Sequence, residues 1–387
     1  MRFLYQPESQ GITHFQLILP TGAGVLFKPG IPFLYSLILN RYGNRKLGRH
    51  FFDRLEERAI HLEIRPGREF LTIEVGALNS QLPDALSYLR ELLEEPNFTE
   101  ETFERGLQER EEIIRNQENN KDYLATKLLY KISFPGTPLA KPSTGELGDR
   151  YQLEELWEFH RQGVRTGGGY LLVVGKEVSP EEFNYLPIGT PPKIPHYTPI
   201  QRYATEEVES EQAYIHFLAP LHSNPKEEGY LRKIAFQILG AGGFGSRIME
   251  EIRVKRGLAY SAYGFAEVRK ITSLFKGHLQ TKLETQQEAV EVLKGVIRRF
   301  LEKGVTEQEV EEAKKFLVGS EPLRRETPMQ RLFIQFREEY FGLGKGYYHR
   351  ELELIQQATA ADVNRYIQRH PEIGKLSIAT VTGRKLG

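Results

Sequence analysis

The sequence predicts an α+β protein built from two homologous domains, each a mostly antiparallel sheet with helices packed on one face. Two observations lead to this prediction. The order of expected strands and helices starts again after a proline-rich segment near the middle of the chain. Two similar stretches, FTEETFERG (98–106) and VTEQEVEEA (305–313), also follow a helix in each half. The length of 387 residues agrees with about two domains of the usual size.

The first half contains strands followed by helices. Alternating apolar residues predict strands, whereas apolar residues three and four apart predict helices. The expected strands cover 14–20, 61–67 and 68–78, and the expected helices cover 47–59, 82–95 and 99–117. Thr99 is the expected N-cap of the last helix. The mostly apolar run 170–178 suits an interior strand that closes this half.

A linker follows, because the segment 179–199 has five prolines after Tyr185 and can be neither a helix interior nor a central strand. We therefore expect an N-terminal domain over 1–178, a linker over 179–205 and a C-terminal domain over 206–387.

The second half repeats the pattern of the first. The expected elements are a strand at 212–221, helices at 227–239 and 246–255, paired strands at 260–268 and 271–281, and helices at 286–304 and 306–317. Thr306 and Glu309 form a capping box at the start of the last helix.

Composition excludes several classes of protein. Lys plus Arg and Asp plus Glu number 52 each, so no net field draws the chain to nucleic acid or to an anionic membrane. The absence of cysteine removes thiolate nucleophiles, disulfides and sulfur-ligated metal sites. The N-terminus has no apolar signal region, and no run approaches the ~18 apolar residues of a spanning helix. We expect a soluble, cytoplasmic protein.

Glycines 240, 242 and 245 match the G-x-G-x-x-G pattern of dinucleotide-binding proteins. That fingerprint requires a strand before it, whereas here a helical run precedes it. We therefore expect either a flexible turn or a loop that a peptide backbone can approach closely. The missing strand disfavours a nucleotide-dependent enzyme. The ten histidines form no H-E-x-x-H or H-x-x-E-H motif, which disfavours a zinc enzyme that carries its own metal site.

The stretch IRVKRGLAYSAYGF (252–265) turns from a charged helix end into an aromatic strand. It carries Arg253 and Tyr260. Simple alternation puts Tyr260 on the same strand face as Ala262 and Gly264. One interpretation is a solvated arginine and a half-buried core tyrosine; the other is a functional pair of hydrogen-bond donors.

The longer stretch LGAGGFGSRIMEEIRVKRGLAYSAYGF (239–265) resembles the second-domain signature of the pitrilysin family of zinc metallopeptidases, the inverzincins, in the branch with mitochondrial processing peptidase and its short bacterial relatives. The resemblance implies two similar α+β domains joined by a linker. It also implies that Arg253 and Tyr260 are the family's substrate-reaching pair, which can stabilise an oxyanion. Gly242, Gly243 and Phe244 would line the substrate entry.

The first-domain zinc motif of that family, H-x-x-E-H, aligns with PGIPFLYSLILNRYGN (29–44). Here Phe33 and Leu37 replace the two histidines, and Ser36 replaces the general-base glutamate. The distal glutamate of the family is matched by Glu109. One carboxylate without two imidazoles cannot hold a catalytic zinc, so we expect no metal in this chain and an ordinary helical charge at Glu109.

The resemblance thus implies a zinc-less, non-catalytic subunit of a bacterial heterodimeric peptidase. A homologous partner subunit would hold the zinc, its activated water and the general base, and the substrate would be an unfolded peptide. The alternative is a homodimeric scaffold or peptide-binding protein of the same fold that takes no part in hydrolysis.

Overall fold

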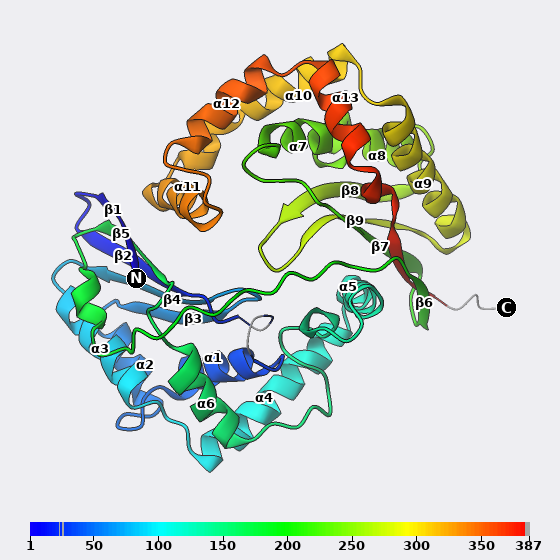
Figure 1. Ribbon diagram of the computed structural model, residues 1–387. Helices are drawn as coiled ribbons and strands as arrows, with labels where there is room; N and C mark the ends of the chain where they lie inside the picture. The colour runs from blue at the N-terminus through cyan, green and yellow to red at the C-terminus, as the bar shows by residue number, and fades with distance from the viewer. Residues whose placement is uncertain (23, 25–26, 384–387) are drawn as a thin grey trace. The chain divides into compact units, whose positions relative to one another are not determined.

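The computed structural model describes residues 1–22, 24 and 27–383. This part of the chain forms two compact units, each with one five-stranded sheet (Figure 1). The first unit is made of 1–117, 141–195 and 325–336; the second is made of 118–140, 196–324 and the described residues from 337 onward.

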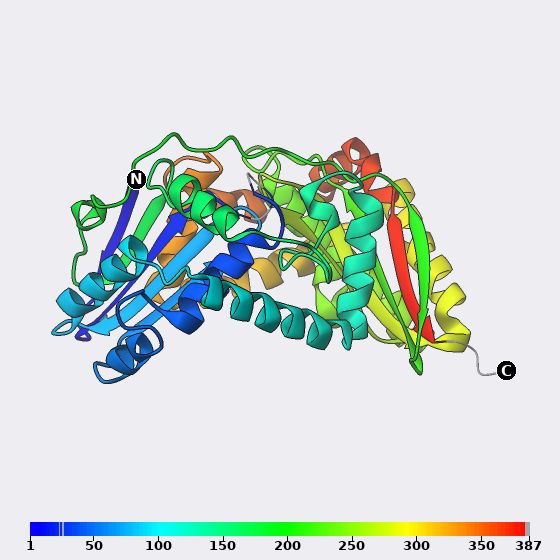
Figure 2. The ribbon, with the colours of Figure 1, turned by 90° about the horizontal axis from the view of Figure 1, so that it is seen from below.

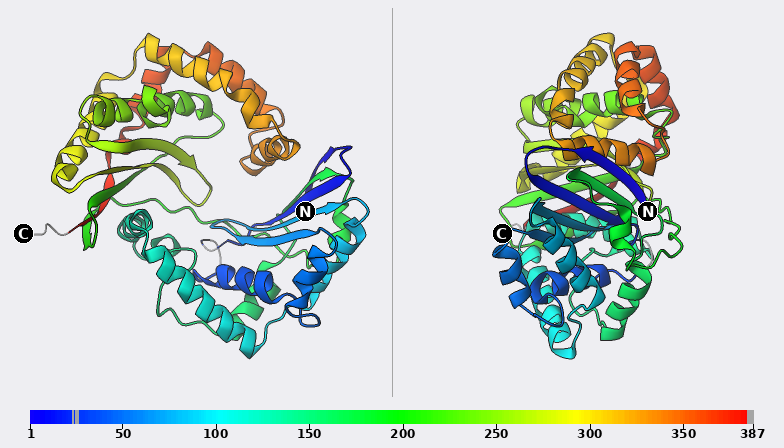
Figure 3. Two further views of the ribbon diagram at one scale, coloured as in Figure 1. Left: turned by 180° about the vertical axis from the view of Figure 1, so that it is seen from behind. Right: turned by 90° about the vertical axis from the view of Figure 1, so that its left-hand side faces the viewer.

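The first unit has strand order β1-β5-β2-β4-β3. In the described part of this sheet, β1 and β5 pair in parallel and the other neighbouring strands pair antiparallel. The strands are β1 (Arg2–Pro7), β2 (Ile12–Leu19), β3 (His61–Pro66), β4 (Leu71–Leu78) and β5 (Tyr170–Gly175). The main helices are α1 (Ile31–Tyr42), α2 (His50–Glu56), α3 (Leu82–Glu94), α4 (Glu100–Glu118) and α6 (Leu153–Gly163). Helix α1 lies along one face of the sheet (Figure 3, left), where its apolar side chains join those of β2 in one buried core.

The second unit has strand order β6-β10-β7-β9-β8, which is the order of the first sheet strand for strand. The strands are β6 (Tyr203–Val208), β7 (Gln212–Pro220), β8 (Ala259–Val268), β9 (Ser273–Lys282) and β10 (Ser377–Gly383). Strand β10 lies between β6 and β7 (Figure 2). The main helices are α7 (Gly229–Phe236), α8 (Arg247–Met249), α9 (Gln286–Lys303), α10 (Glu307–Gly319), α12 (Tyr347–Gln357) and α13 (Ala360–Arg369). The matching topologies confirm the predicted class of two homologous α+β domains.

The compact units depart from the expected continuous ranges 1–178 and 206–387 at one helix in each half. Helix α5 (Lys121–Ser133) belongs to the second unit, and most of α11 (Pro328–Tyr340) belongs to the first. Each covers the sheet face that the other helices leave open. In the second unit, His216 points towards α5, because its neighbours Ile215 and Phe217 lie in the helix-covered core. The prediction of helices on one face therefore misses this additional helix.

The expected linker 179–205 is partly absorbed by the first unit. The side chains of Phe183 and Leu186 are buried in the first core, and regular structure resumes only where β6 begins at Tyr203.

The predicted capping box is present: Thr306 Oγ accepts from the Glu309 amide at 3.3 Å, and Glu309 accepts from the Thr306 amide at 2.9 Å. Among the described residues, no helix combines the length and the apolarity that crossing a bilayer requires.

A buried histidine at the end of α13 makes the stability of the second unit depend on pH. His370 Nδ1 lies 2.8 Å from Glu372, and Nε2 lies 3.1 Å from Glu228. Burial alone would lower the pKa of His370, but the hydrogen bond to Glu372 and the charge of Glu228 outweigh it and raise the pKa. A raised folded-state pKa stabilises the protein at low pH, and this contribution is lost as pH rises through the folded pKa.

We therefore expect the denaturant midpoint of the wild type to fall between about pH 6 and pH 8.5 by more than that of His370→Gln. His50→Gln is the matched control, because His50 also contacts a carboxylate, that of Asp53 at 2.9 Å, but in an exposed pair. Equal pH dependence in the wild type and His370→Gln would refute the assignment.

Candidate functional site

The turn between α7 and β8 contains two π-helical segments. Helix α7 continues as η3 (Gln237–Ala241), and α8 continues as η5 (Glu250–Val254), with a short 3₁₀ turn, η4 (Gly243–Gly245), between them. The expected helices 227–239 and 246–255 therefore both end in a π-helical segment and not in a regular α-helical turn. Single π-helical turns occur frequently at functional sites. Arg253 lies in the second of them and is half-buried.

The glycines of this turn have a structural role, and the segment before them lacks the strand of a dinucleotide-binding fingerprint. A Cβ atom on Gly240 would lie 2.5 Å from the carbonyl oxygen of Gly264, so the helix end packs directly on the backbone of β8. The segment before Gly240 is helical, as we predicted, and no strand leads into the turn. Gly243 has a left-handed backbone with φ of +59°. Gly242 is half-buried and Gly243 is exposed, while the side chain of Phe244 lies outside the described residues.

Replacing Gly240 by Val is expected to push the turn away from β8 and to lower the unfolding free energy by about 1–3 kcal/mol, because the new side chain meets backbone atoms that cannot rotate away. Denaturant unfolding measures the change. Gly245→Ala is the control, since a Cβ atom there meets nothing within 4 Å. A Gly240→Val protein as stable as Gly245→Ala would show that the close approach is not required.

Tyr260 does not follow the alternation that the sequence suggested. Ala262 and Gly264 are buried, so an unbroken pleat would bury Tyr260 as well. Instead, the pairing of β8 with β9 shifts between Ala259 and Ser261, which makes Tyr260 the extra residue of a β-bulge. Tyr260 is 65% exposed. The expectation that it shares a face with Ala262 and Gly264 is therefore wrong, and so is a half-buried core position.

Arg253 and Tyr260 flank one hydrogen-bonded turn. The Gly257 amide donates to the Arg253 carbonyl at 2.9 Å, and the Leu258 amide donates to the Ile252 carbonyl at 2.9 Å. Two neighbouring cations, Lys255 and Arg256, bind the carboxylate of Glu251 at 2.6 and 2.8 Å. The hydrogen bond from Lys255 and then that from Arg256 lower the pKa of Glu251. This carboxylate therefore stays ionised and holds the two neighbouring cations.

The positions that replace the zinc motif are part of the first core. Ser36 is buried and donates to the carbonyl of Pro32 at 2.8 Å, one helical turn earlier. Leu37 and Phe33 pack in the apolar cluster of the first unit. None of the three side chains offers a nitrogen or a carboxylate, so these residues do not fit a catalytic zinc.

Glu109 has structural partners on α1. It accepts a hydrogen bond from the hydroxyl of Tyr42, and Arg41 Nε lies 3.8 Å from its carboxylate. Burial and the bond to Glu109 raise the pKa of Tyr42, so the tyrosine remains the donor. Glu109 thus joins α4 to α1.

Comparison with known proteins decides the family. The model of the peptidase M16 inactive domain matches residues 153–317. The non-peptidase homolog YmxG of Helicobacter pylori is 34% identical over 369 residues, which is 92% of this chain and 85% of that protein. The chain belongs to the peptidase M16 family.

This M16 protein also resembles more distant members. An uncharacterized zinc protease of Rickettsia bellii is 22% identical over 78% of this chain and 76% of its own length. The crystal structure of a peptidase M16 inactive domain from Pseudomonas fluorescens superposes with a TM-score of 0.88 at 21% identity, covering 99% of this chain and 95% of that one. The M16 fold is thus shared over the whole chain, and the inactive domain and the non-peptidase relative place this protein among the inactive members of the family.

Proposed function

We propose that this chain is the non-catalytic subunit of a heterodimeric zinc metalloendopeptidase of the mitochondrial-processing-peptidase-like branch. In this proposal Arg253 and Tyr260 bind the peptide at the zinc site of a homologous partner subunit. The observation that carries the proposal is the β-bulge, which exposes Tyr260 in a strand position where regular pleating would bury it. Bulges next to active sites commonly redirect a side chain in this way.

The chemistry of the two side chains suits peptide hydrolysis. The attacked carbonyl becomes an oxyanion, which is stabilised by donors that already point at it. The Tyr260 hydroxyl is one such donor, and the Arg253 guanidinium can hold the oxyanion or the backbone carbonyls of the peptide. Zinc bound to the partner would polarise the carbonyl and activate the water; this chain would bind and orient the substrate.

The edge position of β8 supports binding of an extended peptide. In the sheet of the second unit, β8 is an edge strand, and among the described residues it pairs only with β9. An unfolded peptide can pair with such an edge by strand addition. Gly242, Gly243 and Phe244, in the turn that packs on β8, would line the peptide's entry. We further propose a cytoplasmic complex that contacts neither nucleic acid nor membrane.

The test is hydrolysis of a quenched fluorescent peptide by this chain alone, by a homologous subunit with an intact H-x-x-E-H motif alone, and by their mixture. We expect activity only in the mixture. Hydrolysis by the partner that is unchanged on adding this chain would contradict the proposal and favour the homodimeric scaffold. Zinc-dependent hydrolysis by this chain alone would contradict the non-catalytic role itself.

A further inference from the structure

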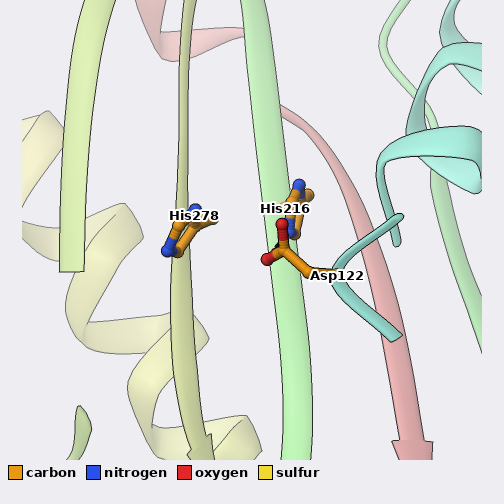
Figure 4. A group of neighbouring side chains, drawn as sticks. All are labelled: Asp122, His216 and His278. Atoms are coloured by element: carbon orange, nitrogen blue, oxygen red, sulfur yellow. Dashed lines mark hydrogen bonds and ion pairs between the residues drawn. The ribbon is translucent and has the colours of Figure 1, made fainter. Parts of the chain in front are cut away.

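Three side chains that are distant in the sequence converge on the sheet of the second unit (Figure 4). His216 on β7 and His278 on β9 are directly opposite each other in the strand register. Their rings are stacked with centroids 5.2 Å apart. Asp122 comes from the first turn of α5, and its carboxylate lies 2.9 Å from His216 Nε2. One donor atom from each residue lies within 4.8 Å of the other two.

The hydrogen bonds of His216 leave a place for a cation between its ring and Asp122. Thr126 has a single hydroxyl proton, which it donates to the Asp122 carbonyl at 3.1 Å. Its oxygen, 3.1 Å from His216 Nδ1, must therefore accept from that nitrogen. The lone pair of Nε2 then faces a carboxylate oxygen, and the two need a proton or a metal ion between them. A histidine that donates its other N–H to a fixed acceptor is the usual arrangement of a metal ligand.

His278 supplies the next ligand. Among the hydrogen bonds of the described residues, its ring has only a 3.5 Å contact between Nε2 and Ser261 Oγ, so at least one of its nitrogens is available. The ring is held in place by Tyr263, whose centroid lies 4.1 Å away. The Asp122 side chain is 48% exposed, which gives an ion from solvent access to the cluster.

We propose that Asp122, His216 and His278 bind a divalent transition metal ion of the zinc class. Two imidazoles and one carboxylate match the ligand preference of zinc, and a water molecule would complete four-coordination. Tetrahedral zinc places its ligand atoms about 3.3 Å apart, so the rings need only small rotations from the 4.8 Å spread.

This site is separate from the position of the family's zinc motif, and it departs from our expectation that the chain holds no metal. A bound ion would fix α5 to the open face of the sheet, because one ligand comes from the helix and two from the strands. The proposal does not depend on the peptidase function, and each can fail without the other.

Metal binding is tested on the full-length chain, stripped with a chelator and titrated with zinc. We expect one zinc per chain by elemental analysis after dialysis and a rise in the thermal midpoint of about 5 °C at zinc 100-fold above its dissociation constant. His278→Gln and Asp122→Asn should each lose most of the bound zinc and the thermal shift. His50→Ala, which removes a surface histidine from an exposed His–Asp pair, should lose neither.

The cobalt-substituted wild type provides a readout that does not depend on a folded variant. We expect its absorption spectrum to show the strong visible bands of a four-coordinate site. Zinc retained by both His278→Gln and Asp122→Asn would overturn the proposal. So would a wild type that binds no zinc after titration, in which case the three residues form a hydrogen-bonded contact between α5 and the sheet.

Discussion

Arg253→Ala and Tyr260→Phe are each expected to lower the peptidase kcat of the mixed subunits by about 10²–10³-fold, the usual cost of removing one oxyanion donor. Tyr260→Phe removes a single hydroxyl from a residue that is 65% exposed, so the fold should remain intact. If the hydroxyl acts on the transition state, kcat falls and KM stays nearly constant. If Arg253 also holds backbone carbonyls of the peptide, Arg253→Ala raises KM in addition.

Two controls test whether the loss of activity is specific to Arg253 and Tyr260. One removes a neighbouring cation, and the other removes the hydroxyl of a different exposed tyrosine. Arg256→Ala removes a cation of the same turn, which is bound to Glu251 at 2.8 Å. Tyr203→Phe removes a hydroxyl from another exposed tyrosine, on β6. Both controls should retain nearly full activity. Loss of activity in the controls equal to that in Arg253→Ala and Tyr260→Phe would point to assembly of the subunits and away from a role in the reaction.

Glu351→Gln is expected to destabilise the second unit by about 2 kcal/mol or more, because removing one partner of a largely buried ion pair leaves the other charge poorly compensated. Lys233 Nζ on α7 lies 2.5 Å from the Glu351 carboxylate on α12. The Glu351 side chain is 8% exposed and the Lys233 side chain 26%. Burial lowers the pKa of Lys233, although Glu351 opposes that shift. The amide cannot stabilise the ammonium group as the carboxylate does.

Urea unfolding monitored by circular dichroism measures the loss. Glu353→Gln on the exposed side of α12 is the matched control and should change stability by less than about 0.5 kcal/mol. The double variant Lys233→Met with Glu351→Leu should recover much of the lost stability, because it leaves neither charge of the pair without its partner. A Glu351→Gln protein as stable as Glu353→Gln would contradict the assignment.

Local patterns predicted most of the central elements of each half. The alternation in β2, β3 and β4 and the helical spacing in α3, α4, α9 and α10 are strong enough that tertiary contacts only confirm them. No local prediction covered β1, α5, α6, β6, β10 or the helices after α10. Segment 121–133 does carry apolar residues at helical spacing, Leu124, Leu128 and Ile132, so its helix could have been predicted. Which sheet it packs against is decided only by tertiary contacts.

A sequence motif located the candidate site, but the geometry predicted for it was partly wrong. Arg253 and Tyr260 could be located because their spacing and their flanking glycines are specific. The position of Tyr260 could not be derived, because a β-bulge depends on the register between two strands, and a single strand's sequence does not contain that register.

The sequence by itself determined the α+β class, the duplication, the family resemblance and the loss of the zinc motif at Phe33, Ser36 and Leu37. Each of these depends on residues close together in the chain or on composition. Only the tertiary structure decided which helix covers which sheet face and brought Asp122 to His216, although the two are 94 residues apart. The reason is physical: helical and strand periodicities describe the chain over one or two turns, whereas contacts across a sheet are set by register and packing between distant segments.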